Sequence, residues 1–327
     1  MDLGRRNTLI LLVASCVVPV AGRAQQAGKI YRLAWLSGSP IVPSTVWSEF
    51  VTAMRELGWI EGRNYSVENL RYDGRSERLS AIAAEAVERK FDLIICAGTP
   101  PTVAAQRATN TIPIVFYSVG DPLGTGVVAT LARPGANITG LGGLGPGIYA
   151  KMLELLIEAS PRSRRIAFVA NSTFALHAVF AAEAESAARR LKLTLVHVEL
   201  RSPEDVDAAF ATIVRERADA LLILGQPFLI GLGPRWAKMA IERRLPAMAP
   251  FDGVVHDGLL MSYGSKIVDD VRRVPQYVDR ILRGASPASL PVEQPIRFYL
   301  TINLKTAKAI DLTVPVSLLQ RADEVID

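Results

Sequence analysis

The chain has 327 residues, of which half are hydrophobic and 21% are charged. This length and composition suit two α/β domains of ordinary size and exclude a wholly disordered chain. The formal net charge is +5, but the first 24 residues hold three arginines and one aspartate, so the rest of the chain carries about +3. The remaining cations alternate with Asp and Glu, and no basic block with aromatic residues occurs, which argues against a nucleic-acid-binding surface.

The N-terminus has the order of a secretory signal. Two arginines precede an uncharged apolar stretch, residues 9–21, and the small residues Gly22 and Ala24 suit cleavage before Gln25. The stretch is shorter than the ~18–20 apolar residues that span a bilayer. We therefore expect residues 1–24 to be a signal peptide and the mature protein to be periplasmic.

The two cysteines have different expected roles. The sequence VASC that ends at Cys16 resembles a lipoprotein processing site, so a lipid anchor at Cys16 is an open alternative to cleavage after Ala24. Cleavage after Ala24 leaves Cys96 alone, which excludes an internal disulfide. Because it lies in the apolar run FDLIICAG, Cys96 is predicted to be a buried structural thiol.

From residue 29 onward, short aliphatic runs alternate with amphipathic stretches, which predicts a parallel α/β architecture. Val46, Phe50 and Met54 recur at helical spacing in the first amphipathic stretch. In the first part of the chain, we predict strands at 29–36, 64–72, 91–98 and 112–118, and helices at 45–59 and 76–90.

Residues 120–147 contain nine glycines and are predicted to cross between two lobes. A second series then follows, with strands at 164–171, 193–200, 218–225 and 245–251 and helices at 149–159, 174–190, 203–217 and 234–244. Strand 258–264 is predicted to return to the first lobe, helix 266–283 follows it, and the tail from 294 crosses back. The expected lobes are 28–140 plus 259–290 and 141–258 plus 291–327.

Small polar residues follow four of the predicted strands. They are Ser37, Gly98 with Thr99, Ser118, and Asn171. Since parallel α/β sheets bind ligands at the carboxyl ends of their strands, we expect these residues to meet at one cleft and to suit a carboxylate or another anion. At any single loop, plain helix capping explains the same residues equally well.

The sequence contains few arrangements that could support catalysis. Its three histidines lie far apart, no G-x-S-x-G motif occurs, and Cys and His are too few for a metal-ligand pattern. Residues 140–145 match G-x-G-x-x-G, but a dinucleotide site also needs an acid at the end of the next strand, which here ends in Asn171. We therefore expect no cofactor, no metal and no enzymatic activity.

Longer segments carry a family resemblance. They are RELGWIEGRNYSVE (55–68), AGTPPTVAAQRATNTIPIVF (97–116), GDPLGTGVVATLARPGANITG (120–140), LLMSYG (259–264) and INLKTAKAIDLTVPVSLLQRADEVI (302–326). Over nearly its whole length, the chain closely resembles the ABC-transporter substrate-binding family, whose best-known branch binds tryptophan and related aromatic amino acids.

The resemblance implies a type I periplasmic-binding-protein fold, with two Rossmann-like lobes of parallel sheet joined by three crossing strands and a ligand held by lobe closure. It implies that the loops at Gly98 and Thr99, Ser118 and Asn171 line the cleft. It also implies a small-molecule solute as ligand, an ABC membrane permease with its ATPase as partners, and a monomer or weak dimer. An exported sensory receptor and an exported enzyme on a Rossmann-like scaffold are the alternatives.

One departure from the family pattern concerns the ligand. Many relatives have Asp-Pro-Phe where this chain has Gln226, Pro227 and Phe228, so a carboxylate that could partner a ligand ammonium group is missing. A carboxylate-bearing or neutral, partly aromatic solute is therefore an alternative to an α-amino acid. We expect Gln226 to act as a neutral selector, and Phe228 and Tyr263 to offer apolar walls.

Overall fold

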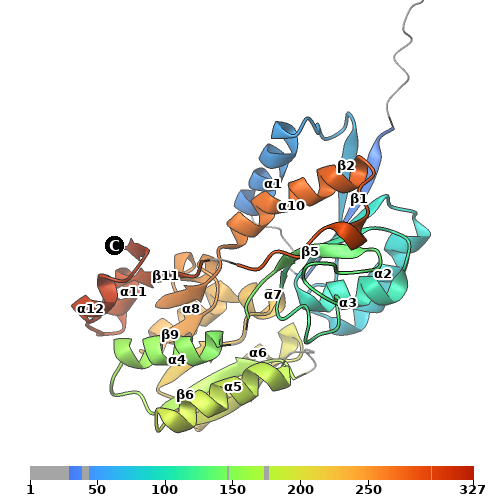
Figure 1. Cartoon of the computed structure of the whole chain (residues 1–327). Helices are drawn as coiled ribbons and strands as arrows, with labels where there is room; N and C mark the ends of the chain where they lie inside the picture. Colours follow the sequence, from blue (N-terminus) through green and yellow to red (C-terminus); the bar gives the residue numbers. More distant parts are fainter. Residues whose placement is uncertain (1–28, 39–43, 146, 173–176, 296) are drawn as a thin grey trace, which may run out of the picture.

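The computed structural model describes residues 29–38, 44–145, 147–172, 177–295 and 297–327. The predicted signal peptide and Cys16 lie outside the described residues. The described chain forms two α/β lobes, each built on its own sheet (Figure 1). No helix within these ranges combines the length and the apolar sequence that a membrane crossing requires.

The first lobe contains a five-stranded parallel sheet in the order β2-β1-β3-β4-β5. Its strands are β1 (Tyr31–Ser37), β2 (Tyr65–Arg71), β3 (Leu93–Ala97), β4 (Ile114–Val119) and β5 (Ile138–Gly142). Its helices are α1 (Ser44–Glu56), α2 (Leu79–Glu88), α3 (Thr99–Ala108) and α10 (Ile267–Leu282), with short 3-10 turns at Ser76–Arg78 and Pro287–Ser289.

Alternation along the strands explains how the helices cover this sheet. Leu33 and Trp35 of β1 belong to the core beneath α1 and α10, whereas Ala34 and Leu36 belong to the core beneath α2 and α3. Figure 1 shows α1 and α10 together on one side of the sheet, and α2 and α3 on the other. Because successive strand residues point to opposite faces, a continuous apolar run is what a doubly covered sheet requires.

The second lobe contains a seven-stranded sheet in the order β12-β11-β10-β9-β8-β6-β7. Its strands are β6 (Arg165–Ala170), β7 (Thr194–Glu199), β8 (Ala220–Ile223), β9 (Ala247–Ala249), β10 (Met261–Gly264), β11 (Tyr299–Asn303) and β12 (Glu324–Ile326). Strands β6 to β10 are parallel to one another, whereas β11 and β12 are parallel to each other and run antiparallel to these five. The helices are α4 (Ile148–Ala159), α5 (His177–Arg190), α6 (Val206–Arg215), α7 (Pro227–Ile230), α8 (Gly233–Glu242), α9 (Gly253–His256), α11 (Leu304–Ala309) and α12 (Val316–Leu319).

The sequence predicts that the glycine-rich segment 120–147 crosses between the lobes, but most of this segment belongs to the first lobe. Val127 and Val128 are buried in the core of the first lobe, and residues 138–142 form strand β5 of the first sheet. Only the residues after Gly142 pass to the second lobe. The G-x-G-x-x-G match therefore begins inside strand β5. Its first residue, Gly140, has to be small because a Cβ there would overlap the carbonyl oxygen of Phe116 on the neighbouring strand.

The prediction that strand 258–264 returns to the first lobe is wrong. Strand β10 pairs with β9 and β11 in the second sheet, and the chain crosses only after Gly264 to begin α10. The reason is packing: Leu259, Leu260 and Met261 are fully buried in the core of the second lobe.

In the described part of the chain, the backbone passes between the sheets after Gly142, after Gly264 and after Glu293, and these connections pack closely. The N–H of Gly142 donates to the Glu293 carbonyl at 2.7 Å, and the N–H of Gly143 donates to Val119 at the same distance. A Cβ at Gly264 would overlap the carbonyl oxygen of Pro250. Small residues thus let the connections lie against one another and against both sheets.

Candidate functional site

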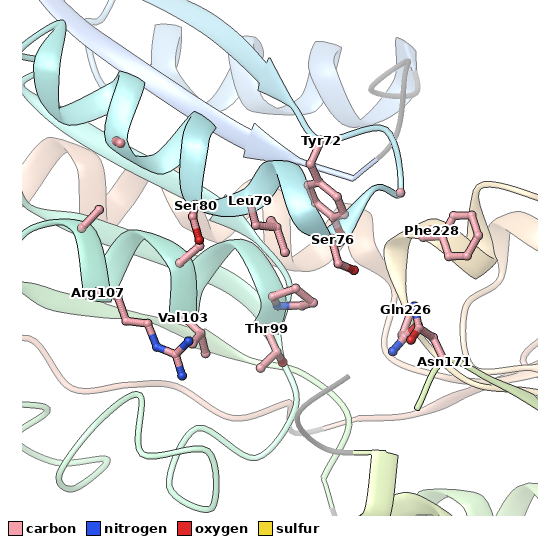
Figure 2. A pocket seen from close by; sticks show the side chains of 15 residues that line it. Tyr72, Ser76, Leu79, Ser80, Thr99, Val103, Arg107, Asn171, Gln226 and Phe228 are labelled. Atoms are coloured by element: carbon pink, nitrogen blue, oxygen red, sulfur yellow. The ribbon is translucent and has the colours of Figure 1, made fainter. Parts of the chain in front are cut away.

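A cleft of about 570 Å³ lies between the lobes, and both lobes line it. The first lobe contributes Tyr72, the turn before α2, and one side of α3; the second lobe contributes Asn171, Gln226 and Phe228. Figure 2 shows Thr99 and Val103 on one side, with Asn171, Gln226 and Phe228 facing them across the cleft. The carboxyl ends of β2, β3, β6 and β8 therefore point to one space, as parallel α/β architecture favours.

Thr99 is the first residue of α3 and is only 2% exposed. Its hydroxyl oxygen accepts the N–H of Gly120 at 3.2 Å, so the hydroxyl proton can be donated elsewhere. Gly98 precedes it with φ +86° and donates its own N–H to the Tyr117 carbonyl at 2.9 Å. Pro100 and Pro101 follow without N–H groups, which leaves Thr99 as the donor at this helix N-terminus.

The wall of the second lobe comes from the residues after β6 and β8. The Asn171 side chain donates to the Arg201 carbonyl at 3.4 Å. Gln226 is 4% exposed, and its hydrogen bonds to described residues run through its backbone N–H and C=O groups. Phe228 lies in the short helix α7 and is also buried. This wall therefore presents two amides and one aromatic ring.

Tyr72 is a cleft residue that the sequence reasoning misses. It directly follows β2, is 3% exposed, and its hydroxyl lies where a Cβ at Gly38 would come within 2.5 Å of it. Burial raises the pKa of the Tyr72 phenol above its usual value, so the group stays a neutral donor. The rule applied to the other strand ends also identifies Tyr72, since it ends the predicted strand 64–72.

Four of the predicted site residues lie outside the lining of this cleft. The Ser37 hydroxyl donates to Asn69 Oδ1 at 2.9 Å, and the Ser118 hydroxyl donates to Asp270 Oδ2 at 2.7 Å. Tyr263 packs against Phe298 with ring centroids 5.9 Å apart. Gly98 acts through the turn that places Thr99.

Ionic groups are scarce at the cleft. Among the described residues that line it, Arg107 is the one charged side chain. Two nearby acids form ion pairs or hydrogen bonds outside the lining: Asp73 pairs through Oδ2 with Arg78 at 2.7 Å while its buried Oδ1 lies 3.9 Å from Arg71, and Glu199 accepts the hydroxyl of Ser172 at 2.8 Å. The cleft therefore combines a neutral polar lining with the partial positive charge of the α3 N-terminus.

The lobes touch at the edge of the cleft. A Cβ at Gly74 of the first lobe would overlap the ring of Phe228 in the second lobe. Beside this contact, Arg75 forms an ion pair with Glu204 across the gap, with 2.5 Å between nitrogen and oxygen. The two lobes are thus in contact at this edge of the cleft.

A second group of polar residues lies near the crossing into α10. Asp252, His256 and Glu324 bring potential ligand atoms within 4.8 Å of one another. Lys266 lies among them, with its ammonium nitrogen 3.1 Å from Glu324 and 3.8 Å from Asp252. The lysine charge offsets one of the two carboxylate charges, and the resulting ion network ties the crossing to β12.

Comparison with known families agrees with this architecture. Residues 45–326 match the family model for ABC transporter substrate binding proteins. The chain belongs to this family. A tyrosine-binding protein from Clostridioides difficile is 26% identical to this substrate-binding protein over 263 residues, which cover 80% of the chain and 75% of the relative.

Solved structures show the same fold. A conserved domain protein from Vibrio cholerae superposes with a TM-score of 0.83 and 26% identity, over 91% of this chain and 100% of that chain. An ABC domain from Streptococcus pneumoniae, solved in complex with L-Trp, superposes with a TM-score of 0.81 and 21% identity over the same shares. The substrate-binding protein has the type I periplasmic binding fold, as the resemblance implies.

Proposed function

We propose that this chain is the extracytoplasmic solute-binding component of an ABC importer, and that it binds a small organic solute between its lobes without chemical conversion. The observation that carries the proposal is the cleft itself, which has walls from both lobes and a volume of about 570 Å³. That volume lies in the range of small-molecule sites, roughly 300–1,000 Å³. Membership of the ABC transporter substrate-binding family supports the same function.

Capture proceeds by lobe closure. The solute enters an open form, and closure then brings Gly74 against Phe228 and Arg75 against Glu204 at the edge of the cleft. The closely packed crossings act as the hinge. The closed protein then presents both lobes to a membrane permease that works with an ATPase.

The lining supports a solute with an apolar, planar part and an anionic end. Leu79, Val103 and Phe228 offer apolar contact, and Thr99 offers N–H and hydroxyl donors at a helix N-terminus. The relative from C. difficile is named for tyrosine and the S. pneumoniae structure holds L-Trp, which supports an aromatic solute.

Export is part of the proposal and has its own test. Mass spectrometry of the protein recovered from cells that express the full chain should give a mature N-terminus at Gln25. A lipid-modified Cys16 would instead support membrane anchorage on the outer side. An unprocessed Met1 in a cytoplasmic fraction would contradict export.

The binding function is tested by thermal unfolding of the processed protein in the presence of amino acids, aromatic acids, small carboxylates and sugars. A solute at a concentration of 100 Kd stabilises a folded protein by about 2.7 kcal/mol, so a true ligand should raise the melting temperature by several degrees. Absence of any shift across the panel, or turnover of a panel member, would contradict the proposal.

A further inference from the structure

Two buried polar side chains face the cleft from opposite lobes and have no side-chain hydrogen-bond partner among the described residues. Tyr72 is 3% exposed and Gln226 is 4% exposed, and both line the cleft. Among the described residues, Tyr72 and Gln226 form hydrogen bonds through their backbone N–H and C=O groups and not through the phenol or the side-chain amide. Because both side chains border the cleft, their polar atoms are available to a solute, and a solute that buries them without pairing them would lose about 1–3 kcal/mol for each group.

The cleft lacks a counter-charge for an ammonium group. None of the described lining residues is Asp or Glu. Asp73 lies outside the lining and forms ion pairs with Arg78 and Arg71, and Glu199 accepts the Ser172 hydroxyl. The undescribed segments that adjoin Gly38 and Ser172 in sequence, 39–43 and 173–176, also contain no Asp or Glu. A buried ammonium ion without a partner is strongly disfavoured.

The same cleft provides donors for a carboxylate. Thr99 offers its N–H and its hydroxyl proton at the N-terminus of the ten-residue helix α3, where the helix dipole favours negative charge. Tyr72 adds a phenolic donor that burial keeps protonated. Gln226, on the opposite wall, can both donate and accept, which suits a neutral polar group on the solute.

We propose, on the basis of the function proposed above, that the solute is an aromatic carboxylic acid without an α-ammonium group. In this proposal, Thr99 and Tyr72 bind the carboxylate, and Gln226 meets the neutral polar end. Tyr72 and Gln226 are the residues that determine specificity, because a carboxylate at position 226 would favour the ammonium form that the amide does not.

Matched ligands test this directly. 3-(4-Hydroxyphenyl)propanoate differs from L-tyrosine only by the ammonium group, and indole-3-propanoate differs from L-tryptophan in the same way. Calorimetric titration of the processed protein should show that each acid binds at least about tenfold more tightly than the corresponding amino acid. Gln226→Asp should shift this ratio toward the amino acid, whereas Gln320→Asp on the exposed surface should leave the ratio unchanged.

The ratio of the two affinities does not depend on the fraction of a variant that folds. Equal or tighter binding of the amino acid by the parent protein, or an unchanged ratio in Gln226→Asp, would overturn the inference. If only solutes of another class, such as sugars, bind the cleft, the inference fails and the proposed function stands. If no solute binds, the proposed function fails as well.

Discussion

At the scale of single residues, the clearest difference between expectation and structure is Ser118. The sequence predicts a ligand anchor, but the Ser118 hydroxyl binds Asp270, which lies 152 residues further along the chain in the first turn of α10. Asp270 is 9% exposed, and its burial raises its pKa to about 7, with a smaller upward effect from the charge of Asp269. No local pattern indicates a partner so distant in sequence.

The Asp270 pair gives a pH-dependent stability. Because the folded pKa of about 7 lies above the unfolded value of about 3.9, the stabilising protonated form is fully present below about pH 4 and is lost as the pH rises through 7. Asp270→Asn keeps an acceptor for Ser118 without the charge. It should therefore raise the free energy of unfolding at pH 8 by about 1–3 kcal/mol and change it little at pH 4.

Urea unfolding of both proteins at several pH values measures this difference. Asp207→Asn, which changes an exposed carboxylate on α6, is the matched control. Its free energy of unfolding should vary with pH as that of the parent protein does. If parent and Asp270→Asn lose stability in parallel between pH 4 and pH 8, Asp270 is not the group responsible.

Other residues were predictable from their immediate sequence. Cys96 is confirmed as a buried thiol, and Thr99, Asn171, Gln226 and Phe228 line one cleft because each follows a strand whose carboxyl end faces it. Strand-end position is a property of sequence order alone. The hydrogen-bond partner of a serine, in contrast, depends on residues that can lie far away in the sequence.

At the scale of elements, the long periodic segments were predictable and the glycine-containing strand was not. Helix 45–59 appears as α1 and strand 193–200 as β7, since apolar spacing specifies both. Strand β5 was not predicted because two of its five residues are glycines, which weaken the alternating pattern of a β-strand. Gly140 allows close approach to the backbone of β4, and Gly142 leaves room for the Gln294 side chain.

Substitution at Gly140 tests this explanation of β5. Gly140 has φ +150°, and a Cβ there would overlap the Phe116 backbone, whereas a Cβ at Gly145 meets nothing within 4 Å. Gly140→Ala should lower the free energy of unfolding by about 2–4 kcal/mol, and Gly145→Ala should change it by less than about 0.5 kcal/mol. Equal effects in urea denaturation would contradict the proposed contact between β4 and β5.

At the scale of the whole molecule, the two-lobed architecture followed from the alternation of strands and helices, but the sheet that each strand joins did not. The apolar residues before Gly264 could pack in the core of either lobe. Their pairing with β9 and β11 places them in the second lobe. The sheet that a strand joins depends on pairing with strands far away in the sequence, so a short segment of sequence does not determine it.

Closure of the lobes can be separated from stability with a matched pair of glycines. Gly74 and Gly62 have φ values of +73° and +77°, so alanine strains the backbone similarly at both. Only at Gly74 would the new methyl group overlap Phe228 of the other lobe. Gly74→Ala should therefore weaken solute binding by about tenfold or more in calorimetric titration, whereas Gly62→Ala should keep the parent affinity. Equal affinities would show that binding does not need this contact.

The central claim is that a solute is held between the lobes. A crystal structure of the processed protein with the solute that most raises its melting temperature tests this claim most directly. We expect the solute to lie between Thr99 of α3 and Gln226 after β8, with the lobes closed over it. Solute density on an outer face of either lobe, with the cleft filled only by water, would contradict the account.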